Sequence, residues 1–332
     1  MIILGIETSC DECSIALVED AKYIHSNIIA SQIVLHKPYN GVVPEIASRL
    51  HVCWIRQVFE AALKKADISL DKIDGIAVTS HPGLLGSLLV GVNFAKGLAL
   101  GLNKPLVGID HIRAHLFAPQ IEHSMDYPYL GVLLSGGHTF ICNVLSYDKI
   151  EILGSTVDDA IGEAYDKVAK HYNLGYPGGV IVDSLAQKGD PMSFMFPGSE
   201  IKKPLHKYDV SFSGLKTAVI NQLQYFSTGK EVTNENICAS FQRVAVGMIM
   251  KRVRKALKDT GLKRVSAGGG VSANSLIRAS LLDLRNDGYD VSLASLKLCT
   301  DNAAMVAGLG YMYLKDGITS SLELDATSSF RL

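Results

Sequence analysis

Two histidines stand four residues apart in the segment His111-Ile112-Arg113-Ala114-His115. On a helix, this spacing places both imidazoles on one face, where they can bind a single metal ion. Asp301, at the start of a later predicted helix, is a candidate third ligand, and two histidines with one carboxylate make an open site suited to iron or zinc. A zinc protease would carry a catalytic glutamate directly after the first histidine, where this chain has Ile112. From spacing alone, a surface histidine pair remains the commoner explanation.

Two predicted turns between strands have the composition of ligand-binding loops. The first, at residues 7–14 (ETSCDECS), is dense in hydroxyls and carboxylates. It can offer backbone N–H groups to a phosphate while Asp11 or Glu12, our candidate catalytic carboxylates, positions a metal or takes a proton. The second, at 135–139 (SGGHT), has paired glycines that let a ligand approach the backbone closely. A solvated turn explains the first segment equally well, but two such turns at corresponding places favour a ligand role.

Further glycine-rich segments follow predicted strands. Residues 82–87 (PGLLGS) open a helix but lack the lysine of a P-loop, so a P-loop nucleoside triphosphatase is not expected. Residues 268–274 (GGGVSAN) lack the spacing of a dinucleotide-binding loop, yet they suit a flat base or ribose, with Asn274 offering hydrogen-bond donors and an acceptor. Asp158, Asp159, Glu163 and Asp166 form a predicted acidic helix face near the turn at 176–179 (YPGG) and Asp183. This group can grip a ribose or an amine, although a solvated helix face is the common alternative.

The elements that position these segments follow one order twice, β-β-β-α-β-α-β-α, with a helical insertion at about 157–230. The first set is predicted at 2–6, 14–18, 23–29, 45–66, 73–79, 84–101, 105–109 and from 111; the second at 129–134, 139–145, 149–155, 234–259, 263–267, 272–285, 290–294 and 301–315. We predict an N-terminal lobe at 1–108 and a C-terminal lobe at 109–301 that face each other across a cleft. A C-terminal helix within 302–332 is expected to pack back on the first lobe. A single doubly wound sheet is the alternative, but three strands before the first helix argue against it.

Composition limits the possible partners. Hydrophobic residues make up 48% of the 332 residues and the formal net charge is −1, so the chain predicts a globular protein without a general basic field for RNA. Any RNA binding must use local patches or a partner's surface. Six cysteines are scattered; Cys10-x-x-Cys13 lacks a second pair, and small core cysteines are the simpler explanation. We find no leader and no apolar run of membrane-spanning length, which favours a cytoplasmic protein without a membrane partner.

Taken together, these segments resemble the tRNA threonylcarbamoyl transferase family, formerly named O-sialoglycoprotein endopeptidase. The resemblance spans nearly the whole chain in order: ETSCDE at 7–12, GVVPEIASRLH at 41–51, PGLLGSLLVG at 82–91, HIRAH at 111–115, SGGHT at 135–139, TVDDAIGEAYDK at 156–167, YPGG at 176–179, VSFSGLKTA at 210–218, GGGVSANSLIR at 268–278 and CTDNAAM at 299–305.

The resemblance implies a duplicated α/β fold of the actin, Hsp70 and sugar-kinase (ribonuclease H-like) type. It implies transfer of the threonylcarbamoyl group from threonylcarbamoyl-adenylate to N6 of the adenosine 3′ of the anticodon, in tRNAs that read codons starting with adenine. It also implies one divalent metal per subunit, with iron favoured and zinc possible. The implied partners are tRNA, the adenylate, a paralogous actin-like subunit and a small ATPase subunit.

Position by position, His111, His115 and Asp301 match the family's metal ligands. Its nucleotide or substrate contacts match Leu134, Ser135, Gly136, Gly137, His138, Asp166, Gly179, Asp183 and Asn274. Three residues depart from the family's usual pattern, namely Arg113 in place of Glu, His81 in place of Gly and Cys13 in place of Thr. Two rivals remain: a small-molecule kinase of the same fold and a non-catalytic nucleotide-binding scaffold. Neither role requires a metal triad.

Overall fold

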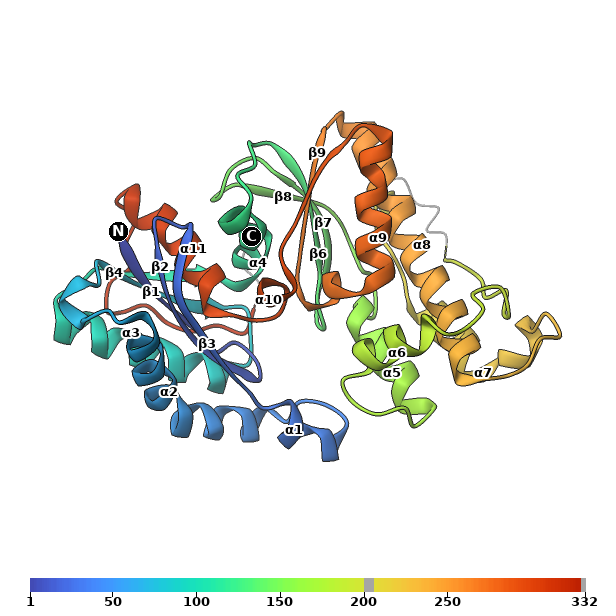
Figure 1. The fold of residues 1–332 in the computed structure, drawn as a ribbon, viewed down its shortest axis with the longest axis horizontal. Coiled ribbons are helices and arrows are strands. Elements are labelled where there is room, and N and C mark those ends of the chain that lie inside the picture. The colour runs from blue at the N-terminus through green and yellow to red at the C-terminus, as the bar shows by residue number, and fades with distance from the viewer. Residues whose placement is uncertain (200–205, 330–332) are drawn as a thin grey trace. The chain divides into compact units, whose positions relative to one another are not determined.

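The computed structural model describes residues 1–199 and 206–329, and these residues divide into two compact units (Figure 1). Unit 1 comprises Met1–Ser124 and Ala294–Leu332, and unit 2 comprises Met125–Leu293. In the described part of the chain, each unit is built on one five-stranded sheet. The predicted duplicated α/β, actin-like architecture is confirmed at the level of each unit.

The sheet of unit 1 has the strand order β3-β2-β1-β4-β5. The strands β1 (Ile2–Glu7), β2 (Glu12–Glu19) and β3 (Tyr23–Ser31) form an antiparallel meander, and β4 (Gly75–His81) and β5 (Leu106–Asp110) continue it in parallel with β1. Residues 3–7 of β1 are all buried, as expected for a strand covered on both faces. The parallel strands end together at one edge, and this edge carries the first predicted site.

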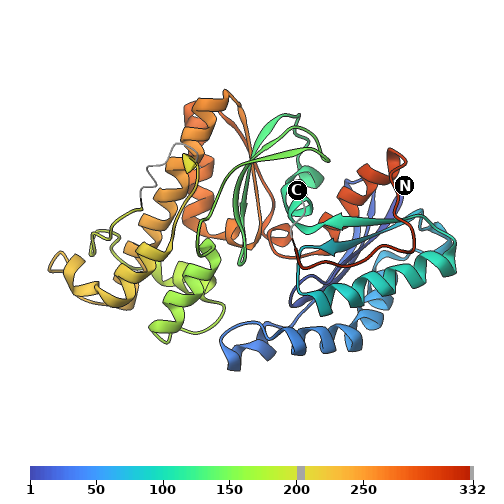
Figure 2. The same ribbon diagram turned by 180° about the vertical axis from the view of Figure 1, so that it is seen from behind.

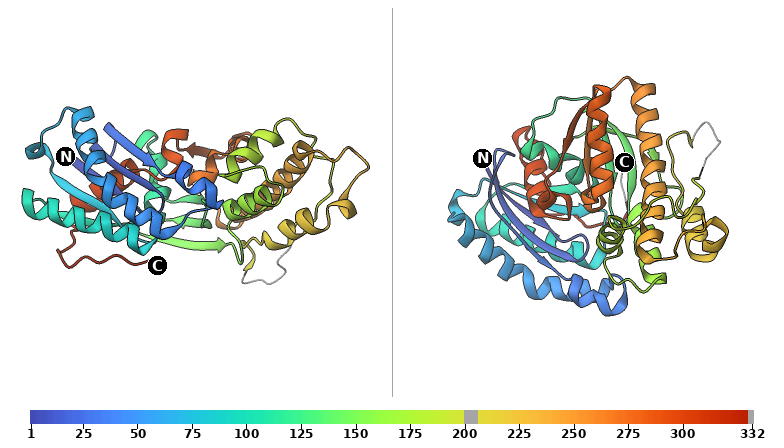
Figure 3. Two further views of the ribbon diagram at one scale, coloured as in Figure 1. Left: turned by 90° about the horizontal axis from the view of Figure 1, so that it is seen from below. Right: turned by 45° about the vertical axis from the view of Figure 1, so that its right-hand side comes forward.

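Helices cover both faces of this sheet. The helices α2 (Pro44–Ala66) and α3 (Leu85–Leu102) lie side by side and pack on the face that carries Leu4 and Ile6 (Figure 3). On the other face, α11 (Ala303–Lys315) packs on β1 and on α4 (His111–Glu122). A Cβ atom at Gly5 would lie 2.3 Å from the carbonyl oxygen of Ala303, so only glycine allows the start of α11 to approach β1 this closely. Short helices α1 (Ile33–His36) and α10 (Leu296–Cys299) complete the unit.

Unit 2 repeats the same arrangement with the order β8-β7-β6-β9-β10. Its strands β6 (Tyr129–Leu134), β7 (Thr139–Val144) and β8 (Ile150–Ser155) form the meander, and β9 (Arg264–Gly268) and β10 (Asp290–Leu293) run parallel to β6. The helices α8 (Asn234–Thr260) and α9 (Ser275–Asp283) lie side by side next to this sheet (Figure 2). The insertion contributes α5 (Ile161–His171), α6 (Gly178–Ala186) and α7 (Ser213–Asn221).

Two predicted boundaries change in the structure, and a third is confirmed. The first lobe does not end at residue 108, because α4 packs against α11 and residues 109–124 and 294–301 therefore belong to unit 1. The last helix, predicted at 301–315, is confirmed as α11, which ends at Lys315 and packs on β1 as expected; of the remaining stretch up to 332, the described residues 316–329 are not helical, and 330–332 lie outside the described residues. The helix predicted at 272–285 is divided, since Asn274 caps α9.

The structure also differs from two other predictions. Asp158 and Asp159 precede α5 rather than lying on it; Asp158 accepts hydrogen bonds from Ser211 and the backbone of Phe212, and Asp159 pairs with Lys167.

The helix α3 is long and apolar enough to cross a membrane by length and composition, contrary to the expectation that no such run exists. Length and composition alone are weak evidence for a membrane-spanning helix, since the core helix of a soluble protein passes the same test.

Candidate functional site

The carboxyl ends of three parallel strands meet in unit 1. Glu7 ends β1, Thr79 lies near the end of β4, and His111 begins α4 directly after β5. In open α/β sheets, ligand sites gather at this edge. The capping residue Asp110 accepts a hydrogen bond from the backbone N–H of Arg113 at 2.9 Å, so α4 starts at His111 and turns both histidines to one face.

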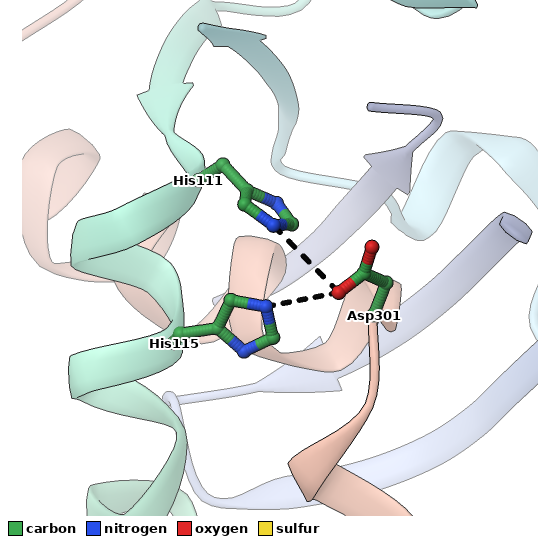
Figure 4. Close-up of side chains that lie close together, drawn as sticks. All are labelled: His111, His115 and Asp301. Carbon is green, nitrogen blue, oxygen red and sulfur yellow. Dashed lines mark hydrogen bonds and ion pairs between the residues drawn. The ribbon is translucent and has the colours of Figure 1, made fainter. Parts of the chain in front are cut away.

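The predicted metal ligands come together (Figure 4). His115 Nε2 lies 3.0 Å and His111 Nε2 lies 3.6 Å from Asp301 Oδ1, and one ligand atom from each of the three residues lies within 4.8 Å of the others. His111 and His115 are buried, and their rings meet edge to face at 4.5 Å. Asp301 arrives from the segment before α11, which the Ser14 hydroxyl anchors by accepting from the backbone N–H of Ala303 at 2.9 Å. Two imidazoles and one carboxylate thus converge from distant parts of the sequence.

Charge in this cluster favours a cation. Burial alone would lower the pKa of His111, but Glu7 and Asp301 outweigh it and raise that pKa to about 9. Burial, together with the neighbouring His111, lowers the pKa of His115. The cluster therefore holds a proton on His111 at neutral pH when nothing else supplies positive charge, and a divalent ion bound to the imidazoles would displace that proton.

The candidate catalytic carboxylates lie in the adjacent β1–β2 turn. Asp11 is buried, and Glu12, the first residue of β2, accepts a hydrogen bond from the Ser31 hydroxyl at 3.1 Å. Burial, followed by the nearby Asp301 and Asp11, raises the pKa of Glu12 well above its usual range. Burial and neighbouring negative charge thus make Glu12 a carboxylate that readily takes up a proton.

The cysteines of this turn do not form a thiolate pair. Cys13 is fully buried in the core of unit 1, and burial raises its pKa to about 12. Burial, with Asp11 and Asp301, also raises the pKa of Cys10. Both residues are therefore neutral thiols. The prediction of a small core cysteine is confirmed for Cys13, whereas Cys10 is half-buried.

In unit 2, the corresponding turn presents bare backbone. The backbone N–H of Ser135 donates to the carbonyl of His138 at 2.9 Å, which closes the turn and leaves Gly136 and Gly137 exposed. A Cβ atom at either glycine would meet no atom of the described chain within 4 Å. At Gly162, near the start of α5, a Cβ atom would lie 2.7 Å from Gly136 Cα. The amino end of α5 therefore packs directly on this turn, which favours an anion there.

The glycine loop after β9 joins the same edge. Gly269 has φ +89°, and a Cβ atom there would lie 2.4 Å from the carbonyl oxygen of Leu134. Gly269 is thus required by packing on β6, whereas Gly136 and Gly137 are not. The structure brings the Leu134–His138 turn and the Gly268–Gly270 loop together at the carboxyl ends of β6 and β9.

The remaining predicted contacts form two hydrogen-bonded groups. Asp166 Oδ1 accepts from the backbone N–H of Gly178 at 2.7 Å, at the start of α6, while Gly179 has open space around its Cα among the described residues. Asp183 accepts from the hydroxyl of Ser275 at 2.6 Å and from its backbone N–H at 3.0 Å. Asn274 is buried and caps α9. Asp183 and Asn274 therefore already hold the start of α9 in place.

Two residues that the sequence analysis did not single out contact predicted site residues, one in each unit. Gln242, buried in α8, accepts from Asn274 Nδ2 and donates to Asp183 Oδ1, each at 2.9 Å. Glu7, with no exposed surface, contacts His111. The sequence held a signal for both, because each is a polar side chain in a mostly apolar buried stretch, and such a side chain needs a partner.

Comparison with known proteins identifies a family. The family model described as tRNA N6-adenosine threonylcarbamoyltransferase matches residues 23–308. A protein of that name from Treponema denticola is 55% identical over 329 residues, covering 99% of this chain and 97% of that protein. One from Borreliella burgdorferi is 50% identical over 330 residues, covering 99% of this chain and 94% of that protein.

Solved structures of low sequence identity support the fold. HypF from T. kodakarensis has a TM-score of 0.65 at 14% identity, over 97% of this chain and 48% of that chain. Component A of the (R)-2-hydroxyglutaryl-CoA dehydratase of Acidaminococcus fermentans has a TM-score of 0.56 at 15% identity, over 95% of this chain and 99% of that chain. At these identities, the likeness concerns the fold alone.

Proposed function

The chain belongs to the tRNA N6-adenosine threonylcarbamoyltransferase family, and we propose that it transfers the threonylcarbamoyl group of threonylcarbamoyl-adenylate to N6 of the adenosine 3′ of the anticodon, releasing AMP. The observation that carries this proposal is full-length relatedness at 55% identity to a protein named for this reaction. The substrate tRNAs would be those that read codons starting with adenine.

The chemistry requires positioning and proton transfer. The N6 amine attacks the carbamoyl carbon, a C–N bond forms, the bond from that carbon to the phosphate oxygen breaks, and AMP leaves with the bonding electrons. Because the donor is a mixed anhydride, no ATP is needed at this step. The amine proton must pass to a base, and we assign this role to Glu12 or Asp11, both of which lie in the β1–β2 turn. Orientation of the amine supplies much of the remaining rate enhancement.

The triad of unit 1 fits a resident divalent metal, iron or zinc. His111, His115 and Asp301 would be its ligands, because their donor atoms lie within 4.8 Å of one another and the site already gathers positive charge on His111. A bound ion would supply Lewis acidity or an anchoring charge. Three protein ligands leave positions open, as in a catalytic rather than a closed structural site.

The adenylate is assigned to unit 2. Its phosphate would lie at the Ser135–His138 turn, where exposed glycines and the amino end of α5 meet. Its adenosine would lie along the Gly268–Asn274 loop, with Leu134, Asp166, Gly179 and Asp183 shaping the surroundings. The exposed glycine pair supports this placement, since substituents there would not disturb the described chain but would occupy the ligand's space.

The two rival functions are not favoured. A small-molecule kinase of this fold and a nucleotide-binding scaffold both lack a use for a buried cluster of two histidines and a carboxylate. Full-length relatives named as transferases weigh further against both.

We assign the chain to a cytoplasmic complex without a membrane partner. Its partners would be tRNA, a paralogous actin-like subunit and a small ATPase subunit. On α3, Leu85 and Leu89 are exposed by 49% and 38%, respectively, and are available for docking a related subunit. The net charge of −1 gives little general attraction to RNA, so partner surfaces would supply part of the tRNA contact.

Mass spectrometry of tRNA nucleosides tests the function. Cells depleted of this protein should lose threonylcarbamoyl-adenosine and regain it when the wild-type chain is restored. An unchanged level of the modified nucleoside after depletion would contradict the proposal. A turnover of ATP with a small acceptor by the purified chain would favour the kinase instead.

A further inference from the structure

We infer that Glu7 is a positioning residue that orients His111 toward the metal, an inference that rests on the proposed metal site. Glu7 is the last residue of β1 and has no exposed surface. An ionised carboxylate this deeply buried is costly unless other groups donate to it. Three donors from three segments surround it.

The carboxylate of Glu7 is held in one orientation. Its Oε1 accepts from the backbone N–H of Ser9 at 2.6 Å, and its Oε2 accepts from the Thr79 hydroxyl at 2.5 Å. His111 Nδ1 lies 3.1 Å from the same Oε2 and 3.2 Å from the Ser9 hydroxyl. The backbone places two of these donors. The N–H of Ser9 belongs to the turn that follows β1, and Thr79 lies on β4, the strand paired with β1.

This arrangement decides which nitrogen of His111 faces the ion. The carboxylate oxygen Oε2 can only accept a hydrogen bond, so Nδ1 carries the hydrogen that it donates to Glu7. The lone pair then belongs to Nε2, which is the atom turned toward Asp301 at 3.6 Å. A carboxylate behind a histidine both selects this tautomer and makes the imidazole a stronger ligand.

Glu7 is not itself a fourth ligand. Both of its oxygens already accept hydrogen bonds, and its contact is with Nδ1, on the side of the ring away from the ligand atom. His115 offers a contrast, because in the described part of the chain its Nδ1 has no hydrogen-bond partner. Of the two imidazoles, His111 is therefore the one with a carboxylate support.

Glutamine at position 7 should reverse the tautomer. The backbone N–H of Ser9 cannot turn away, so the amide oxygen of Glu7→Gln must occupy the place of Oε1. Its NH2 group then faces His111 Nδ1, which has to accept, and the proton moves to Nε2. A protonated Nε2 cannot bind a metal. The substitution preserves the shape of the side chain, so a large loss of folding is not expected.

Zinc affinity of the full chain tests the inference, measured against a competing chromophoric chelator, with Asp110→Asn as the control. Asp110 is a buried carboxylate next to His111 that makes none of the described hydrogen bonds of His111, and asparagine can still cap α4. Glu7→Gln should bind zinc about 10- to 100-fold more weakly than the wild type, the range for loss of a group behind a ligand, and Asp110→Asn should be much less affected. In zinc-loaded wild type labelled with 15N-histidine, His111 should carry its proton on Nδ1.

Each outcome bears on a separate claim. A wild type that binds no zinc overturns both the proposed metal site and this inference. Zinc binding that is lost in His111→Ala but unchanged in Glu7→Gln leaves the metal site standing and overturns the role of Glu7. Equal weakening in Glu7→Gln and Asp110→Asn makes the effect one of charge and also overturns it. Should Glu7→Gln fail to fold, Thr79→Val, which removes one donor to Oε2, should give an intermediate weakening; unchanged affinity there would contradict the inference.

Discussion

The β1–β2 turn of unit 1 and the β6–β7 turn of unit 2 occupy the same place in two copies of one arrangement, yet the groups around them differ in kind. The first is surrounded by ionisable side chains, namely Glu7, Asp11, Glu12 and, from other segments, His111 and Asp301. The second exposes Gly136 and Gly137 and lies against the amino end of α5. The same sheet edge therefore occurs once in each unit. Ionisable side chains make the edge of unit 1 suited to a cation, and exposed backbone makes the edge of unit 2 suited to an anion.

This contrast predicts, first, that removal of one of the three proposed metal ligands causes a large loss of activity. Asp301→Ala removes the carboxylate to which both imidazoles point, so we expect transferase activity in the reconstituted reaction to fall about 100-fold or more. The comparison is His25→Ala, an exposed histidine of unit 1 that pairs with Glu19. Near wild-type rates in Asp301→Ala would remove the triad from the mechanism.

The second prediction concerns the packed glycine of unit 2. In Gly269→Val, the valine would have to adopt a positive φ, and its Cβ would clash with the carbonyl oxygen of Leu134. The free energy of unfolding should therefore fall by about 1–3 kcal/mol from backbone strain alone, and further because of the clash. Urea unfolding would measure the loss. A wild-type midpoint for this variant would mean that the loop can move away from β6.

The third prediction concerns the exposed glycine of the turn. Gly137→Val adds a side chain in open space, so stability should stay near that of the wild type while AMP affinity falls about tenfold, roughly 1.4 kcal/mol. Calorimetric titration with AMP and a thermal unfolding curve separate the two effects. Unchanged AMP affinity would move the phosphate away from this turn.

The smallest effect on the chain itself is expected on α3. Leu89→Asp places a charge on an exposed position and should change the free energy of unfolding by less than about 0.5 kcal/mol, whereas Leu88→Asp, at a fully buried neighbour, should prevent stable folding. Reconstituted activity with partner subunits should nevertheless decrease in Leu89→Asp. Robust multiple turnover by the isolated wild-type chain, given substrate, metal and tRNA, would count against a need for docking.

Much of the fold was predictable because it depends on local pattern. The three opening strands, the helix at 44–66 and the repeated order of elements follow from hydrophobic periodicity and turn residues. The boundary between the two units could not be predicted in this way, because it depends on the packing of α4 against α11, and no local pattern links these two segments. The interruption at Asn274 depends on a helix cap that was present in the sequence but not recognised.

The candidate site shows the same division. The pairing of His111 with His115 is readable from spacing, but their convergence with Asp301 requires α11 to lie on β1, where Gly5 admits it. The support from Glu7 depends on the joint ends of β1, β4 and β5 and was therefore missed. Asn274 was predicted as a polar contact for a ligand, and its amide turns out to be engaged with Gln242 and the start of α9.

The most direct test of the contrast measures metal content and AMP affinity together in three proteins: wild type, His111→Ala and Gly137→Val. Elemental analysis should find about one metal ion per chain in the wild type and in Gly137→Val, and little in His111→Ala, since three ligands form one open site. AMP affinity should fall in Gly137→Val. Equal metal content in all three proteins would contradict the assignment of the cation to the side chains of unit 1.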